Sequence, residues 1–329
     1  MKIIVSIGDC NGIGLETFYK AVQKLSLNKA LDKKIHLTLA GNKKTIKEYF
    51  KKLNYEIKDT KEGILIENKE IDVIDLSFYS PVDFGKITEK SAKLTIEALD
   101  YSVNAVINKN FDAIVTLPIN KYALQSVGWN FPGHTEFLAE KTQSNSYMMI
   151  LMTRKLRVAL VTTHIPLSDV SKKINQKLIK NKAKIFYHTL EQDFSIKKPK
   201  IAVLGLNPHA GENGAIGKEE NRIIQPAIDK LNSEGNSYYG PFPADGFFAH
   251  NDYKNYDGIL AMYHDQGLIP LKLLAGNKGV NFTANLPIVR TSPDHGTAFQ
   301  IAGKGIASGD STFEAIRMAY LISKRRNNL

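Results

Sequence analysis

Three histidines follow three separate apolar segments, an arrangement typical of side chains that meet at one metal ion. They are His164 in VALVTTHIPLSD, His209 in IAVLGLNPHAGENG and His264 in ILAMYHDQG. Each apolar segment is expected to be a buried strand, and open α/β sheets bind their ligands in the loops at the carboxyl ends of strands. Imidazole is the commonest protein ligand for a divalent metal. The alternative is that each histidine only hydrogen-bonds within its own loop, and the repetition of the pattern argues against it.

The wide spacing of these histidines indicates which kind of metal site to expect. Compact structural zinc sites place their ligands a few residues apart in the sequence. Here dozens of residues separate one histidine from the next. The spacing therefore favours an open, catalytic type of site over a structural zinc site.

The elements that must position the histidines alternate between short apolar runs and amphipathic segments. A helix is predicted over Glu89–Asn108, because apolar residues recur there at steps of four and three. Further helices are predicted from about residue 15 and over about 311–324, and strands at 2–7, 36–40, 71–75, 113–117, 147–152, 156–162, 201–206 and 259–262. This alternation predicts an α/β fold with a largely parallel sheet and helices on both faces.

The composition excludes several classes of protein. Hydrophobic residues make up 43% and charged residues 23% of the 329 residues, as in ordinary globular proteins. No apolar run approaches the roughly 18 residues that span a bilayer, and the first apolar stretch is too short for a signal peptide. The single cysteine, Cys10, cannot form an internal disulfide and is interpreted as a small packed residue. We therefore expect a cytoplasmic protein with no membrane partner.

The net charge of +11 could indicate a nucleic-acid surface, but the distribution of the charge argues against it. The lysines are scattered in small clusters, and no nucleic-acid-binding motif accompanies them. We expect no nucleic-acid partner. A basic field would still attract an anionic substrate.

Two glycine-rich loops resemble nucleotide-binding motifs without matching them. GDCNGIG at Gly8–Gly14 has the wrong spacing for a dinucleotide fingerprint. The segment from Gly211 to Lys218 has five residues between its glycines where a phosphate-binding P-loop has four, and Glu219 stands where Ser or Thr would bind magnesium. Neither loop is interpreted as a phosphate-binding motif.

The C-terminal stretch SPDHGTAFQIAGKGIASG, Ser292–Gly309, resembles the adenosine-binding loop of the isocitrate and isopropylmalate dehydrogenases, which bind NAD(P) without the Rossmann fingerprint. Within that superfamily, motifs along nearly the whole chain resemble the 4-hydroxythreonine-4-phosphate dehydrogenases of vitamin B6 biosynthesis. These motifs are Gly8–Glu16, Leu117–Lys121, Gly133–Ala139, Thr162–Leu167, Gly205–Glu212, Pro243–Phe248, Tyr263–Lys272 and Gly279–Phe299. Many motifs in the right order are far more specific than any single one.

The chain departs from the family pattern at a few positions. The first loop has Cys10-Asn11 and Leu15 where the family favours Pro-Ala and Pro, and Gly246 replaces a Thr. Ala284-Asn285 replaces a Leu-Gly type pair, and Gln300 stands where an Asp is usual in the cofactor loop. The last two departures leave the details of NAD contact open, and none of them removes a metal ligand of the family.

The resemblance implies roles for residues within these motifs. In the family three histidines hold one divalent metal ion, zinc, magnesium or cobalt, and they correspond to His164, His209 and His264. Substrate binding is implied for His134, Thr135, Lys272, Asn281 and Arg290, and binding of NAD or NADP for Asp294, His295, Gly296, Thr297 and Gly303. Lysine and arginine suit a substrate that carries a phosphate and a carboxylate.

The general base stays open among Lys121, Asp245 and Asp265. Asp265 could instead orient a histidine ligand such as His264. The resemblance also implies a homodimer with a shared active site, in which His264 is expected to complete the metal site of the partner chain.

The implied fold is the isopropylmalate-dehydrogenase-like three-layer α/β/α fold, with two lobes and a cleft between them. The lobes are expected at about 1–120 plus 285–329, on the NAD side, and at 121–284, which holds the metal and the dimer contacts.

The implied reaction is NAD-dependent oxidation of 4-phosphooxy-L-threonine to 2-amino-3-oxo-4-phosphooxybutanoate, which loses CO₂ to give 3-amino-2-oxopropyl phosphate for pyridoxine 5′-phosphate synthesis. The nearest alternative is a dehydrogenase of another phosphorylated four-carbon acid, threonate or erythronate 4-phosphate. Alternatives from other classes are a metal-dependent hydrolase that uses the three histidines to activate water, and a metal-binding or nucleic-acid-associated protein without catalytic activity.

Overall fold

The computed structural model describes residues 1–328, and the chain divides into two compact units. Unit 1 comprises Met1–Asn145 and Leu286–Asn328, and unit 2 comprises Ser146–Asn285. The two units therefore meet near residues 145 and 285, and the sequence-based expectation placed the lobe boundaries near residues 120 and 285. The segment between residues 120 and 145 belongs to unit 1 because its helices pack on a long helix of that unit, Glu89–Ile107.

Unit 1 is built on a mostly parallel sheet with the strand order β13-β6-β1-β2-β5-β4-β3. Its strands are β1 Lys2–Ser6, β2 His36–Gly41, β3 Lys58–Asp59, β4 Gly63–Ile66, β5 Lys69–Asp75, β6 Ala113–Thr116 and β13 Arg290–Pro293. Every residue of β1 after Lys2 is buried, as expected for a strand covered on both faces. The pairs β3–β4 and β4–β5, at one edge, are antiparallel.

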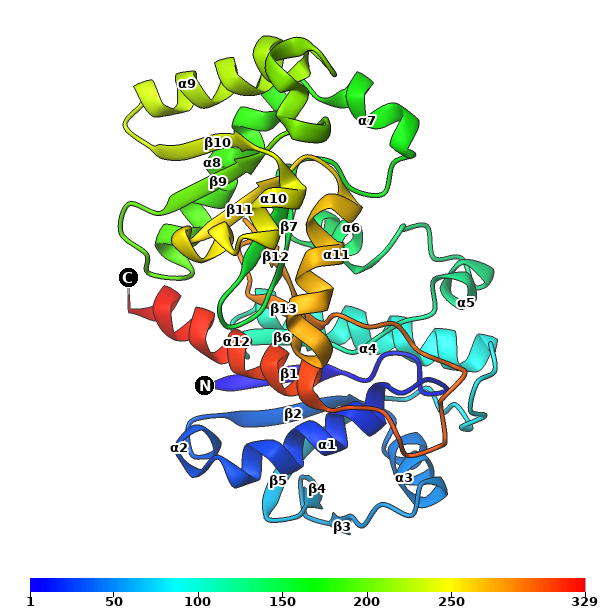
Figure 1. The fold of residues 1–329 in the computed structure, drawn as a ribbon. Coiled ribbons are helices and arrows are strands. Elements are labelled where there is room, and N and C mark those ends of the chain that lie inside the picture. The colour runs from blue at the N-terminus through cyan, green and yellow to red at the C-terminus, as the bar shows by residue number, and fades with distance from the viewer. Residues whose placement is uncertain (329) are drawn as a thin grey trace. The chain divides into compact units, whose positions relative to one another are not determined.

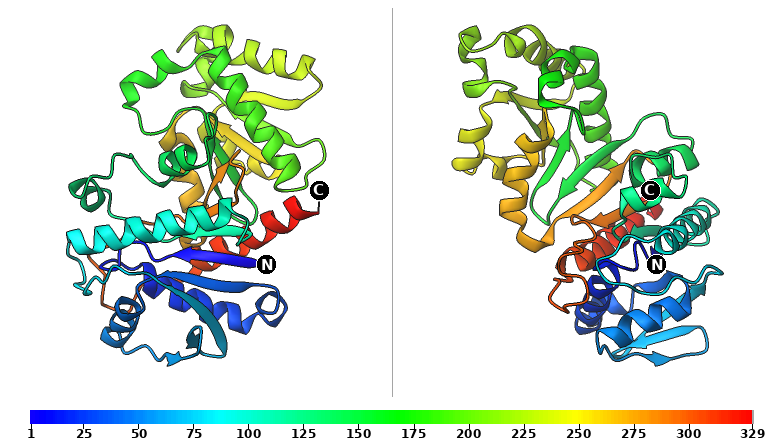
Figure 2. Two further views of the ribbon diagram at one scale, coloured as in Figure 1. Left: turned by 180° about the vertical axis from the view of Figure 1, so that it is seen from behind. Right: turned by 90° about the vertical axis from the view of Figure 1, so that its right-hand side faces the viewer.

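Helices cover both faces of the unit 1 sheet. They are α1 Gly14–Leu27, α2 Lys29–Asp32, α3 Lys43–Lys52, α4 Glu89–Ile107, α5 Lys121–Ser126, α6 His134–Lys141 and α12 Asp310–Asn327. Helices α1 and α12 pack together on one face, and α4 covers the other (Figures 1 and 2). The amphipathic helix predicted over 89–108 is confirmed, and the Thr88 side chain caps it by accepting a hydrogen bond from the Ser91 N–H.

Unit 2 has the strand order β10-β9-β11-β8-β7-β12. Its strands are β7 Met148–Met152, β8 Arg157–Leu160, β9 Lys200–Leu204, β10 Ser237–Phe242, β11 Gly258–Ala261 and β12 Val280–Ala284. The strands β8 to β11 run parallel, whereas β7 is antiparallel to both of its neighbours. The predicted parallel sheet is therefore confirmed for the strands that precede the three histidines.

The helices of unit 2 are α7 Leu167–Lys173, α8 Gln176–Gln192, α9 Gln225–Ser233, α10 Ala244–Ala249 and α11 His264–Ala275, with short helical turns η1 Pro208–Gly214, η2 Glu220–Ile224, η3 Asp252–Asn255 and η4 Gly276–Lys278. Helix α8 lies on one face of the sheet and α10 and α11 lie on the other (Figures 1 and 2). Gly267 lets α11 approach β8 closely, because a Cβ there would lie 2.6 Å from Val158 Cγ1. In the described part of the chain, no helix has the length and apolarity needed to cross a bilayer.

Candidate functional site

Three neighbouring strands of unit 2 each lead into one of the three histidines. The order β9-β11-β8 is contiguous and parallel, so the carboxyl ends of these strands lie at one edge of the sheet. His164 follows β8, His209 follows β9, and His264 is the first residue of α11, directly after β11. The fold thus places all three histidine loops at the edge where such sheets bind ligands.

His164 and His264 lie side by side in the same chain. Their ring centroids are 5.9 Å apart, with the ring planes at 42°. A zinc–nitrogen bond is about 2.0–2.1 Å, so two imidazoles on one ion have centroids roughly 5–6 Å apart. The two rings border a cavity of about 420 Å³ whose lining residues are Thr162, Thr163, His164, Ile165, Leu167, Val170, Tyr263, His264 and Asp265. The pair is therefore spaced to donate two nitrogens to one divalent ion.

Hydrogen bonds hold this pair and connect its loops. His264 Nδ1 lies 2.7 Å from Asp265 Oδ1, which leaves Nε2 of that ring as the metal donor. Thr162 joins the β8 loop to the β11 loop, because its hydroxyl donates to the Met262 carbonyl at 2.7 Å. Gln266 accepts from the Met262 N–H at 2.7 Å and donates to the Gly205 carbonyl, so it connects the ends of β11 and β9. The role of Gln266 was missed by the sequence analysis, although it lies within the YHDQG motif.

His209 does not join the pair within one chain. It is exposed, on a turn in which five consecutive residues from His209 to Asn213 have positive φ, between 42° and 78°. Four of these five carry side chains, for which left-handed helical backbone costs roughly 1–2 kcal/mol per residue. Across residues 1–328, no group of three His, Cys, Asp or Glu side chains is arranged to hold a metal ion. The donors present fit a divalent metal by type, and the described chain brings two of them together.

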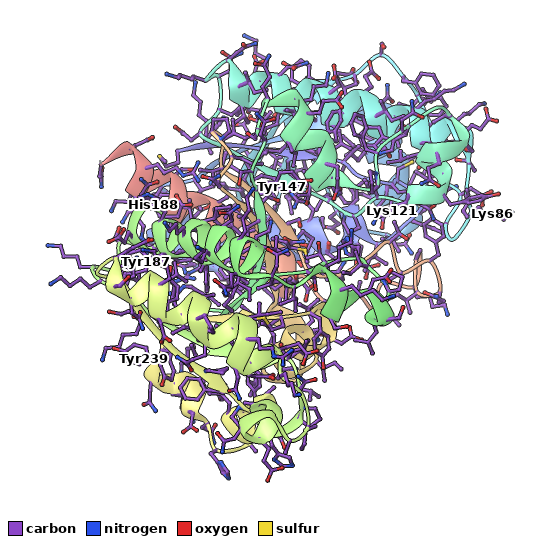
Figure 3. All side chains as sticks on the ribbon, turned by 90° about the horizontal axis from the view of Figure 1, so that it is seen from above. Lys86, Lys121, Tyr147, Tyr187, His188 and Tyr239 are labelled. Atoms are coloured by element: carbon purple, nitrogen blue, oxygen red, sulfur yellow. The ribbon has the colours of Figure 1, made fainter. Side chains whose placement is uncertain are left out.

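A second group of polar residues lies in unit 1, around the end of β6 and the start of α6. Arg290 on β13 is 2% exposed, and its Nε and Nη2 donate to Thr116 Oγ1 at 3.1 and 2.7 Å. Burial lowers the pKa of the Arg290 guanidinium, and the charge of Glu136 acts in the opposite direction. Lys121, labelled in Figure 3, begins α5, and its Nζ would lie 3.5 Å from a Cβ placed at Gly133. Two cations thus lie close to the first turn of α6.

His134 opens α6 beside these cations. Burial, together with the charges of Arg290 and Lys121, holds the pKa of His134 well below its ordinary value, so the ring is neutral near pH 7. Its Nε2 is buried and has no hydrogen-bond partner among the described residues. A buried polar nitrogen without a partner is unfavourable, and an anionic or hydroxyl group of a ligand would satisfy it. This group of residues therefore suits the anionic substrate predicted from the sequence, and Thr135, next to His134, is half-buried.

The remaining predicted substrate and base residues lie in unit 2. Lys272 is exposed on α11, and Asn281 lies on β12 with a buried Oδ1 that has no hydrogen-bond partner in the described structure. Asp245 is exposed in the first turn of α10 and does not line the histidine cavity. Asp265 lines that cavity and contacts His264. The geometry therefore suits Asp265 to orienting a ligand, whereas Asp245, the other candidate base in unit 2, has no described contact with the histidine pair.

The predicted cofactor loop packs against the first glycine loop of unit 1. The Ile13 N–H donates to the Thr297 carbonyl at 3.0 Å, and a Cβ at Gly12 would lie 2.8 Å from the Thr297 oxygen. His295 has a pKa lowered mainly by burial, and its Nε2 is buried without a described hydrogen-bond partner. Gly303 has a φ of +80°, and a Cβ there would lie 2.5 Å from the Phe84 ring. The other predicted members, Asp294 and Gly296, flank His295 in the same loop. The orphaned His295 nitrogen fits a ligand with hydrogen-bonding groups, as a nicotinamide dinucleotide has.

Glu16 and Lys20 on α1 hold the second half of the cofactor loop. Lys20 Nζ donates to the Gly305 and Ala307 carbonyls at 2.8 and 2.7 Å and pairs with Glu16 Oε1 at 3.0 Å. The same Glu16 oxygen accepts from the Ala307 N–H at 2.7 Å. Glu16 belongs to the motif Gly8–Glu16, but its role as an anchor for a loop nearly 300 residues later was not predicted.

The departures at Cys10 and Asn11 have structural roles in unit 1. The Asn11 side chain donates to the Lys86 carbonyl at 2.9 Å and accepts from the Asp83 N–H at 2.8 Å, so it organises the segment that precedes α4. Cys10 is buried, and desolvation raises the pKa of its thiol to about 11. The thiol is therefore protonated at neutral pH, in agreement with its interpretation as a packed residue.

Comparison with known proteins finds relatives that match this chain over nearly its whole length. A family model described as "Pyridoxal phosphate biosynthetic protein PdxA" matches residues 33–319. A 4-hydroxythreonine-4-phosphate dehydrogenase from Sulfurihydrogenibium sp. is 43% identical over 99% of both chains. A crystal structure of the enzyme of that name from Klebsiella pneumoniae covers 98% of both chains with 36% identity and a TM-score of 0.84. A protein from Oceanobacillus iheyensis, provisionally named as a D-threonate 4-phosphate dehydrogenase, is 39% identical over 96% of both chains.

Proposed function

Because the chain belongs to the PdxA family and is an oxidoreductase, we propose that it oxidises 4-phosphooxy-L-threonine with NAD or NADP as hydride acceptor. The product is 2-amino-3-oxo-4-phosphooxybutanoate. This β-keto acid loses CO₂ to give 3-amino-2-oxopropyl phosphate, a precursor of pyridoxine 5′-phosphate. The observation that carries the proposal is the pairing of His164 and His264, 5.9 Å apart, at the carboxyl ends of neighbouring parallel strands.

The histidines are proposed to hold one divalent cation. Imidazole donors suit zinc or cobalt, and magnesium stays open where substrate oxygens complete the coordination. When bound, the cation supplies Lewis acidity to the substrate hydroxyl. Asp265 fixes the orientation of the His264 ring through the hydrogen bond to its Nδ1.

Substrate binding is proposed for the predicted residues His134, Thr135, Lys272, Asn281 and Arg290. Arg290 and Lys121 support an anion-binding role in unit 1, because both place positive charge beside the unpartnered His134 nitrogen. Arg290 is positioned by Thr116, so its guanidinium is ordered before a ligand arrives. The proton of the substrate hydroxyl passes to a base, and the candidates for this base stay Lys121, Asp245 and Asp265.

The third metal ligand is proposed to come from a second copy of the chain, in a homodimer. Two observations support this: the absence of a three-donor group in the described chain, and an apolar face on α11 that begins within two turns of His264. Ile269, Leu273 and Leu274 on this helix are 58%, 81% and 51% exposed. Exposed apolar side chains in such a group are typical of an interface.

The ligand that crosses between subunits is assigned to His209. The sequence-based expectation gave this role to His264. The side-by-side placement of His164 and His264 in one chain favours the partner's His209 instead.

The alternative substrate is threonate 4-phosphate, because the relative from Oceanobacillus iheyensis carries the name of a dehydrogenase of that compound. The two substrates differ at carbon 2, where one carries an amine and the other a hydroxyl. NADH formation measured with each at equal concentration separates them. We expect kcat/KM to be at least tenfold higher for 4-phosphooxy-threonine. A higher value for threonate 4-phosphate would reassign the substrate, and release of inorganic phosphate without NADH would indicate a hydrolase.

A further inference from the structure

The left-handed turn that carries His209 is held from one side by a buried carboxylate. Glu220 Oε1 accepts from the Leu206 and Asn207 N–H groups, both at 2.7 Å. Its Oε2 accepts from Asn207 Nδ2 at 2.9 Å. Glu220 is 2% exposed, although it belongs to a residue type that is rarely buried. One carboxylate therefore fixes two successive backbone N–H groups and a side chain immediately before the turn.

The turn also fits around this carboxylate. Gly211 lies in the middle of the turn at a φ of +78°, and a Cβ there would lie 2.5 Å from Glu220 Oε2. The Gly205 Cβ position is 3.2 Å from Oε1. The carboxylate thus fills the concave side of the turn, and the backbone on both sides of His209 packs against it.

The local helix geometry brings Glu220 to this position. It is the first residue of η2, a π-helical turn over Glu220–Ile224 that continues into α9. π-Helical turns are rare and are frequently found at functional sites. Here the wide turn directs the buried carboxylate of Glu220 toward the loop that carries His209. The neighbouring Glu219 stays partly exposed, and its Oε2 accepts a hydrogen bond from Asn207 Nδ2 at 2.9 Å.

We propose that Glu220 is a positioning residue for the metal site: it maintains the left-handed turn and so fixes the direction in which His209 presents its imidazole. The inference rests on the proposed role of His209 as a metal ligand. Glu220 acts through the backbone of the turn and has no described contact with the His209 ring, unlike Asp265, which contacts the ring of His264.

Cobalt(II) binding to the full-length metal-free protein tests this inference, by titration and by the visible absorption of the bound ion. Glu220→Gln keeps the size of the side chain but replaces one acceptor oxygen with an N–H donor. We expect its dissociation constant for cobalt to rise at least tenfold, in line with the effect of removing groups that orient metal ligands, and the absorption spectrum to change. Glu212→Gln is the matched control, because Glu212 is an exposed carboxylate of the same turn. We expect it to change the constant less than twofold.

Two further variants separate the possible outcomes. Gly211→Ala pushes on the carboxylate from the other side and should weaken cobalt binding as Glu220→Gln does, which keeps the test valid if either variant fails to fold. His209→Ala reports on the proposed ligand itself.

If His209→Ala loses tight cobalt binding while Glu220→Gln and Gly211→Ala keep the wild-type dissociation constant and spectrum, the positioning role is wrong and the metal site stands. If His209→Ala binds cobalt as the wild type does, the proposed site is wrong, and the role of Glu220 with it. A loss of thermal stability without a change in cobalt affinity would also overturn the positioning role.

Discussion

Replacing Lys20 with methionine should weaken both the fold of unit 1 and the binding of NAD. Lys20 Nζ contacts the Glu16 carboxylate and the Gly305 and Ala307 carbonyls, all within 3.0 Å. Glu16 has no exposed side-chain surface, so Lys20→Met leaves a buried carboxylate without its cation. Removal of one partner from a buried pair costs about 3–5 kcal/mol. Because the Lys20 side chain is 25% exposed and the Ala307 N–H still donates to Glu16, we expect a loss of about 2–3 kcal/mol.

The matched control is Lys24→Met, one turn further along α1. Lys24 pairs with Asp310, but these side chains are 42% and 28% exposed. An exposed pair of this kind contributes about 0–1 kcal/mol. Both variants are measured by urea unfolding, and then by the KM for NAD and the KM for the phosphorylated substrate.

We expect Lys20→Met to raise the KM for NAD at least fivefold and to leave the KM for substrate nearly unchanged, because Gly305 and Ala307 belong to the predicted cofactor loop. Equal losses of stability in Lys20→Met and Lys24→Met would refute the energetic argument. A loss of stability with an unchanged KM for NAD would show that the loop does not contribute to cofactor binding.

The other predictions concern the substrate pocket and the metal ligands. Arg290→Ala should lower kcat/KM by a factor that corresponds to about 1.5–3 kcal/mol, through the KM for the phosphorylated substrate; an effect confined to NAD would move Arg290 to the cofactor site. Because the pKa of His134 is depressed, the unfolded chain binds a proton below about pH 6.5 that the folded chain does not, so the free energy of unfolding decreases by up to about 1.4 kcal/mol for each pH unit that the pH is lowered. Urea unfolding of His134→Gln between pH 5 and 7 should show a shallower pH dependence, and an unchanged slope would contradict the buried neutral ring. Mixed dimers of His209→Ala and His164→Ala should recover about a quarter of wild-type activity, because half of the dimers are mixed and each has one intact site. Mixed dimers of His264→Ala and His164→Ala should recover none, and the opposite pattern would return the crossing role to His264.

The sequence predicted the parts of the fold that depend on local patterns. The strands that lead to the histidines and the amphipathic helix at Glu89–Ile107 follow from apolar runs and from helical periodicity, and the structure has them within a few residues. The antiparallel direction of β7 was not predictable, because an apolar run of residues does not indicate whether the strand runs parallel or antiparallel to its neighbours. The boundary at residue 145 depends on how α5 and α6 pack, which is a tertiary property.

The candidate site shows the same division. Residue type and position after a strand predicted His164 and His264 as metal ligands, and the structure places their two rings side by side. The sequence could not show that Gln266 connects two of the loops or that Glu220 supports the third, because both act through backbone groups distant in the sequence. The assignment of one histidine to the partner chain had no local signal in the sequence either.

The formation of NADH from 4-phosphooxy-L-threonine, followed at 340 nm, tests the central claim most directly. The account predicts turnover by the wild-type protein, loss of turnover after treatment with a chelator, and its return when zinc or cobalt is added. His164→Ala should stay inactive under all three conditions. NADH formation that persists at full rate in the chelator-treated protein and in His164→Ala would contradict the proposed metal-dependent dehydrogenase.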